Sequence, residues 1–94
     1  MKNCKDDRLN RIHKSSFGNM ENLYKDKHCG CFHCGAMFNS KDIYEWVHEI
    51  GDLRTALCPY CGVDSVISES CGEKITKKLL VEMHEHYFKV EGIV

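Results

Sequence analysis

The fold of this chain is decided by two short stretches, CFHCG at residues 31–35 and CPYCG at residues 58–62. Each has the form C-x2-C-G, in which two thiolates and the intervening backbone N–H groups can face one cation, and the glycine allows the tight turn that follows. Four thiolates close a tetrahedral shell with no open position, which is the arrangement of a structural zinc site. The pattern therefore predicts one Zn²⁺ per chain, with the ligands Cys31, Cys34, Cys58 and Cys61.

Three further cysteines, Cys4, Cys29 and Cys71, lie outside this pattern. Cys29 stands close to the first pair, beside His28 and His33, so the sequence offers more potential ligands than one zinc ion can use. The second pair, Cys58 and Cys61, has the C-x2-C-G form. The pair of the same form in the first stretch is Cys31 with Cys34, which leaves Cys29 out. We expect Cys29 to pack as a small apolar side chain or to hydrogen-bond near the site, while its replacing a ligand stays an alternative. Cys4 is expected to be a free thiol and Cys71 to be structural or free.

The length of 94 residues suits one domain, and so short a chain needs a cross-link to be stable. The odd number of cysteines and the polar opening residues argue against a secreted disulfide protein. We therefore expect a cytoplasmic protein. Since no apolar run approaches the roughly 20 residues that span a bilayer, we expect no contact with a membrane.

Charge divides the chain into two parts. Residues 1–27 carry seven Lys/Arg and four Asp/Glu, a net charge of +3, whereas residues 28–94 carry six and ten, a net charge of −4. The first part has weak apolar periodicity and is predicted to be a polar, partly flexible N-terminal leader, with one short helix at Met20, Leu23 and Tyr24. The second part is predicted to be the zinc-ribbon-like domain. Its acidity disfavours a nucleic-acid partner, although such a partner stays possible.

The linker between the two cysteine pairs has the periodicity of a helix over residues 40–50. Ser40 is the expected N-cap and Gly51 the expected end. The apolar residues recur at i, i+3, i+4 and i+7 and would form one face, with Trp46 in the core: Ile43, Trp46, Val47 and Ile50.

Two short strands are expected around the second pair, at residues 54–57 and 63–68, joined as a hairpin with CPYCG at its tip. A helix capped by Thr76 is expected to follow, over residues 76–88. The predicted fold is therefore small α+β: a zinc-ribbon-like or rubredoxin-like two-knuckle metal site with a short β-hairpin, one linker helix and one C-terminal helix.

Two redox readings compete with structural zinc. CPYC is also the active-site sequence of glutaredoxins, but there the first cysteine begins a helix, whereas strand-like residues follow Cys61 here. Rubredoxins combine C-x2-C-G with C-P-x-C-G around iron, yet the proline-rich wrapping between their pairs is missing, since Pro59 is the only proline of this chain. Iron is therefore the lesser alternative to zinc.

The runs CGCFHC at residues 29–34 and TALCPYCGVDSVI at residues 55–67, with shorter matches near residues 43–46 and 83–88, resemble a family of small, uncharacterised bacterial cytoplasmic proteins. The resemblance implies a zinc-ribbon-like domain in the cytosol and brings no established activity. Asp64 and Ser65 belong to its most specific block, CPYCGxDSVI. They could face a ligand, although hydrogen bonding of the turn is the commoner role of such residues.

A closed four-thiolate site leaves no position for a substrate, and we find no catalytic or cofactor-binding constellation in the sequence. We therefore expect no enzyme but a zinc-stabilised binding module that contacts an unidentified protein partner, as an adaptor or antagonist. The first alternative is a nucleic-acid-binding zinc ribbon that uses the cations of the leader. The second is rubredoxin-like electron transfer or CPYC thiol redox chemistry. The leader's cations are Lys2, Lys5, Arg8, Arg11 and Lys14.

Overall fold

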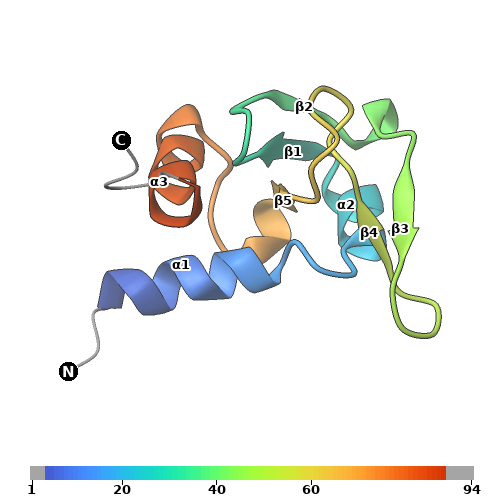
Figure 1. Ribbon diagram of the computed structural model, residues 1–94, viewed down its shortest axis with the longest axis horizontal. Coiled ribbons are helices and arrows are strands. Elements are labelled where there is room, and N and C mark those ends of the chain that lie inside the picture. Colours follow the sequence, from blue (N-terminus) through green and yellow to red (C-terminus); the bar gives the residue numbers. More distant parts are fainter. Residues whose placement is uncertain (1–3, 89–94) are drawn as a thin grey trace.

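The computed structural model describes residues 4–88, and their side chains from residue 7 onward (Figure 1). The described chain is α+β, with three helices, two small antiparallel sheets and two 3₁₀ turns. The elements are α1 (Cys4–Lys14), α2 (Met20–Asp26), β1 (His28–Cys31), β2 (Met37–Asn39), η1 (Ser40–Asp42), β3 (Trp46–His48), β4 (Arg54–Ala56), β5 (Val66–Ser68), η2 (Glu69–Cys71) and α3 (Lys77–Tyr87).

The central sheet has the order β2-β1-β5, and both pairs are antiparallel. Strand β1 lies in the middle, with Cys29 opposite Phe38 on one side and opposite Ser68 on the other. Strands β3 and β4 form a separate hairpin, which lies at the end of the molecule away from α3 (Figure 1). The first CxxCG stretch therefore follows the middle strand directly, and the second connects the hairpin to the sheet edge.

Buried side chains cover both faces of the central sheet. Neighbouring residues of a strand point to opposite faces, and β5 shows this plainly: Val66 packs in one apolar cluster and Ile67 in the other. One cluster joins the sheet to α1 and α3, and the other joins it to α2 and the hairpin. Gly30 lets α3 approach, because a Cβ atom there would lie 2.9 Å from side-chain atoms of Ile75 and Leu80.

Residues 4–27 are packed against the rest of the chain, which differs from the partly flexible leader that we expected. Leu9 and Ile12 of α1 are fully buried in the cluster with α3. The guanidinium of Arg8 bonds the carboxylate of Glu73, with Nη2 2.6 Å from Oε1, and reaches Glu82 at 3.0 Å. This contact holds the pKa of Glu73 below its usual value. Sparse apolar residues thus suffice to dock α1, because each of them is buried.

Two predicted helices are confirmed. Helix α2 begins at Met20 and buries Leu23 completely. Helix α3 begins after Thr76, whose hydroxyl accepts a hydrogen bond from the backbone N–H of Leu79 at 3.1 Å. Within the described residues, no helix is long and apolar enough to cross a membrane.

The helix that we predicted over residues 40–50 is wrong. The side chain of Asn39 accepts from the N–H of Lys41 at 2.9 Å, but the helical turn after it ends at Asp42. The chain then extends into β3, where its backbone is paired by β4. Aromatic and β-branched residues dominate positions 43–47, and such side chains favour strands.

The exposure of the apolar side chains in the linker also contradicts the predicted helix, which would bury all of them on one face. Ile43 is buried, while Val47 and Ile50 are 40% and 81% exposed. Gly51, which we expected to end the helix, has a φ of +65° and lies in the turn between β3 and β4.

The predicted hairpin around the second cysteine pair is wrong in its pairing. Both strands exist, as β4 and β5, but β4 pairs with β3 and β5 pairs with β1. The turn at residues 58–62 is closed by its own backbone hydrogen bonds, such as Cys58 N–H to the carbonyl of Val63 at 3.0 Å. The two strands leave this turn toward different sheets.

Replacing Leu9 by Ala tests whether α1 belongs to the folded core. Because Leu9 is fully buried, we expect Leu9→Ala to lower the free energy of unfolding by about 2–5 kcal/mol, measured by urea titration of the metal-loaded protein. The control is Val81→Ala on α3, a side chain 45% exposed, for which a change within about 0.5 kcal/mol is expected. Equal effects of both variants would contradict the packing of α1.

Candidate metal centre

The two CxxCG stretches fold as near copies of one another. The N–H of Gly35 donates to the carbonyl of Cys31 at 2.8 Å, and the N–H of Gly62 donates to the carbonyl of Cys58 at 2.9 Å. Both glycines have positive φ, +82° and +78°, a conformation that other residues rarely adopt. We call each such turn a knuckle: residues 31–35 form the first and residues 58–62 the second.

In each knuckle, a backbone N–H group points at the first sulfur. The N–H of His33 lies 3.3 Å from Sγ of Cys31, and the N–H of Tyr60 lies 3.3 Å from Sγ of Cys58. Such N–H donors favour the charged thiolate over the neutral thiol. The backbone of both knuckles is therefore arranged around negatively charged sulfur.

The structure brings together the four cysteines that the sequence pattern singled out. Their Sγ atoms all lie within 4.8 Å of one another. The Sγ atoms of Cys31 and Cys61 are 3.7 Å apart, and so are those of Cys34 and Cys58. A metal with bonds of about 2.3 Å to four tetrahedral sulfurs sets neighbouring sulfurs about 3.8 Å apart. The cluster can thus hold one metal ion and fits the tetrahedral geometry, while the role of the four residues as ligands stays a prediction.

The four thiols differ in their surroundings. Cys31 and Cys58 are buried and Cys34 is exposed. Burial raises the pKa of Cys31 and of Cys61, although backbone N–H groups that hydrogen-bond to each sulfur act to lower it. At Cys34, burial also acts upward, but hydrogen bonds from the backbone of Ala36 and from the other thiols outweigh it and lower the pKa. Because metal binding requires thiolates, loading of this site must release protons.

The other cysteines whose side chains are described are not part of the four-cysteine cluster. Cys29 is fully buried, its Sγ lies 3.5 Å from the carbonyl oxygen of Phe38, and burial raises its pKa to about 12. This confirms the expectation of a small, packed and hydrogen-bonded side chain. Cys71 is buried in the core cluster with α1 and α3, its Sγ 3.6 Å from the carbonyl oxygen of Glu73. The side chain of Cys4 lies outside the described residues.

Within the first knuckle, the Nδ1 atom of His33 is buried and has no hydrogen-bond partner among the described residues. Its ring packs edge-on against Phe88, with centroids 4.7 Å apart, and lies 6.2 Å from the ring of His84. Among the described residues, no second group of three or more potential ligands accompanies the cysteine cluster. The ring contacts of His33 and the 3.2 Å contact of His84 Nδ1 with the carbonyl oxygen of Phe32 pack the end of α3 against the first knuckle.

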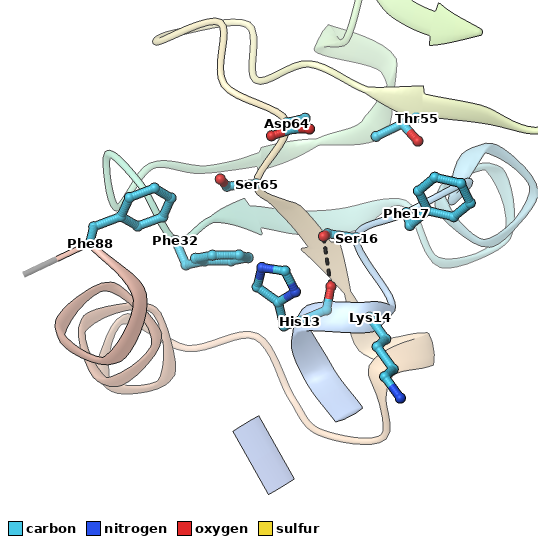
Figure 2. Close-up of a pocket in the computed structure, with 9 residues that line it drawn as sticks. All are labelled: His13, Lys14, Ser16, Phe17, Phe32, Thr55, Asp64, Ser65 and Phe88. Atoms are coloured by element: carbon cyan, nitrogen blue, oxygen red, sulfur yellow. Dashed lines mark hydrogen bonds between the residues drawn. The ribbon is translucent and has the colours of Figure 1, made fainter. Parts of the chain in front are cut away.

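Asp64 and Ser65, which the sequence marked as a possible ligand-facing pair, follow the second knuckle. The carbonyl oxygen of Ser65 accepts from the N–H of Phe32 at 3.0 Å and so ties the second knuckle's exit to the first knuckle. Both residues also line a cavity whose other walls include His13 and Phe17 (Figure 2). We missed the latter two in the sequence, because residues 1–27 were assigned to a leader. Neither residue forms part of a recognisable motif.

Comparisons of the chain with protein-family models, with curated proteins and with solved structures find no significant match. No family is therefore identified, and the resemblance drawn from the sequence stays a prediction. The geometry alone shows a four-cysteine cluster formed by the two knuckles, and this cluster is consistent with a zinc-ribbon-like metal site.

Substituting one cysteine of the cluster tests the site. We expect Cys34→Ser to lose most bound metal, measured by elemental analysis of the purified protein, and to lose helical circular dichroism, because metal binding in small zinc peptides is worth on the order of 10 kcal/mol. Cys29→Ser is the matched control: it keeps a donor near Phe38, so the metal content should equal that of the wild type. Loss of metal in the control alone would show that Cys29, and not Cys34, is a ligand.

Proposed function

We propose that this chain is a non-enzymatic, zinc-stabilised module that binds another protein through the β3–β4 hairpin. The observation that carries the proposal is the exposure of large apolar side chains on this hairpin and directly before it. Ile50 at its turn is 81% exposed and Tyr44 before β3 is 71% exposed, while Val47 and Leu53 are 40% and 45% exposed. Clustered exposed apolar residues with a polar rim are typical of protein-binding surfaces.

The charge on the same arm indicates the kind of partner. Residues 42–52 contain four acidic residues and no Lys or Arg. Complementary charge across an interface steers encounter and excludes wrong partners. We therefore expect a partner protein that offers an apolar depression bordered by Lys or Arg.

Two of the leader's cations weigh against the nucleic-acid alternative. Arg8 is bonded to Glu73 and Glu82, and Arg11 lies 3.4 Å from Glu73. Cations that are neutralised within the chain contribute little to phosphate binding, which depends on unpaired charge. This supports a protein partner over a nucleic acid.

The surroundings of the second knuckle weigh against the redox alternatives. Cys58 precedes a turn and then β5, so it lacks the helix N-terminus that lowers the pKa of a redox-active thiol. A shell of four sulfurs without a free position suits a structural ion, and zinc is the usual metal of such sites.

The identity of the metal can be measured directly. For protein purified without added metal, we expect one zinc per chain by elemental analysis and a colourless solution. Chelation should make four additional thiols reactive toward a thiol reagent, because all four ligands are released together. A red, iron-loaded protein would instead favour electron transfer, and metal-free folded protein would favour thiol chemistry.

The binding surface can be tested by photo-crosslinking in cells. With a photoreactive residue in place of Tyr44, we expect a discrete crosslinked partner whose yield falls at least tenfold in the background Ile50→Asp, because a central apolar contact is worth 2 kcal/mol or more. The matched control carries Val81→Asp on α3, an exposed apolar residue on another face, and should keep the yield.

Three results would contradict the proposal. One is a crosslink that Ile50→Asp leaves unchanged, and another is equal loss in both variants. The third is a crosslinked product that consists of two copies of this chain, which would make the hairpin a self-association surface.

A further inference from the structure

The backbone of β3 is hydrogen-bonded to a neighbouring strand on one edge. The carbonyl of Glu45 accepts a hydrogen bond from the β4 side at 3.1 Å, and the N–H of Glu49 donates to that side at 2.9 Å. Bonded residues alternate with unbonded ones along an antiparallel ladder, so Val47 is the residue between them that also bonds β4. Trp46 and His48 therefore turn their N–H and carbonyl groups away from β4. We call these four groups the outer groups of β3.

The outer groups of β3 form no backbone hydrogen bond within the part of the chain that the structure describes. Figure 1 shows β3 at the rim of the molecule, with β4 on its inner side. The corresponding edges of β4 and β5 are partly closed by one side chain: Asn19 accepts from the N–H of Ala56 at 3.1 Å and donates to the carbonyl of Val66 at 2.8 Å. An unpaired strand edge like that of β3 is a template for a further strand.

Strand β3 also lacks the usual protection of an edge. Edge strands that stay unpaired commonly carry lysine or proline. Residues 43–50 contain neither, and they contain no arginine. The edge strand β2, by contrast, is followed by Lys41 two residues after its end. On each side of β3 stands an exposed apolar residue, Tyr44 before it and Ile50 after it, which favours contact with another chain.

The charges beside β3 select the kind of strand that it can accept. Glu45, Val47 and Glu49 share one face, because neighbouring residues of a strand point to opposite faces. Neither carboxylate has an ion pair or a hydrogen bond with another described residue. Opposite charges on facing residues stabilise a strand pair. The matching strand therefore has Lys or Arg opposite each glutamate and an apolar residue between them, opposite Val47.

A second copy of this chain fits the edge poorly. The register that joins the outer groups of one β3 to those of another is centred on Val47 and sets Glu45 opposite Glu49 twice. Like charges on directly facing residues destabilise a strand pair. The charges thus favour a basic strand from a different protein.

We propose that β3 binds an extended segment of its protein partner by antiparallel strand addition, and that this segment has the pattern basic–x–apolar–x–basic. The inference rests on the proposed function, because the segment belongs to the same partner that receives Ile50. In this pairing the two x residues bond the outer groups of Trp46 and His48. The backbone supplies affinity, and the two basic side chains supply selectivity.

The first test uses a fluorescein-labelled peptide with the core Lys-Thr-Val-Thr-Lys and the metal-loaded, full-length chain. Fluorescence polarisation should show saturable binding that weakens as salt is added. Methylation of the backbone nitrogen of the second threonine, which faces β3, should weaken binding at least tenfold, because a hydrogen bond is lost and the strands are held apart. Methylation of the valine nitrogen, which faces away, is the matched control and should keep the affinity.

The second test changes the protein. His48→Pro removes one outer N–H without removing a bond to β4, and proline is tolerated at edge positions whose N–H faces solvent. This variant should bind the unmethylated peptide at least tenfold more weakly, with unchanged metal content and circular dichroism. Met37→Pro is the matched control, because it places the same change on the outward edge of β2, and it should bind like the wild type.

Strand addition is overturned by absence of saturable binding up to millimolar protein, by equal affinity of the two methylated peptides, or by wild-type affinity of His48→Pro. The methylated peptides decide the question on unaltered protein, even where a proline variant fails to fold. Failure of the proposed function is a separate result. A photo-crosslink from position 44 that is lost in Ile50→Asp but kept in His48→Pro would leave the hairpin as the binding surface and overturn strand addition alone.

Discussion

The convergence of four sulfur atoms from two knuckles is the constraint on which this structure depends. It joins the end of β1 to the connection between β4 and β5, and so fixes the central sheet relative to the hairpin. A domain of this size is stable by only about 5–15 kcal/mol, while metal binding by small zinc peptides is worth about 10–16 kcal/mol. The two apolar clusters hold the helices in place, and a metal ion bound by the four cysteines would add a contribution of this size.

The parts of the fold that follow from spacing or from local chemistry could be predicted from the sequence. The C-x2-C-G repeat is enough to single out the four clustered cysteines, and Thr76 marks the start of α3 because its hydroxyl caps a backbone N–H. The linker misled us because its apolar residues match a helical period. In the structure, pairing with β4 decides its conformation, and a period drawn from four residues does not show whether the segment pairs with the strand that follows it.

The role of the first 27 residues shows a different limit. Their composition is that of a mobile segment, yet two buried residues and one arginine dock α1. The partners of that arginine, Arg8, are Glu73 and Glu82, which lie 65 and 74 residues further along the chain. A local sequence pattern cannot predict contacts over such distances. The same holds for the cavity: Asp64 and Ser65 stand in a conspicuous block, but His13 and Phe17 join them only through the tertiary fold.

The middle place of β1 in the sheet has a consequence for biosynthesis. Its two neighbours, β2 and β5, both come later in the chain, and β5 ends at Ser68. On the ribosome, the first knuckle is therefore complete well before the second, and Leu9 and Ile12 wait for α3 to cover them. At about 5–20 residues per second this interval lasts a few seconds. During it, the nascent chain exposes thiols and apolar side chains together, so it needs protection from aggregation before the four sulfur atoms can meet.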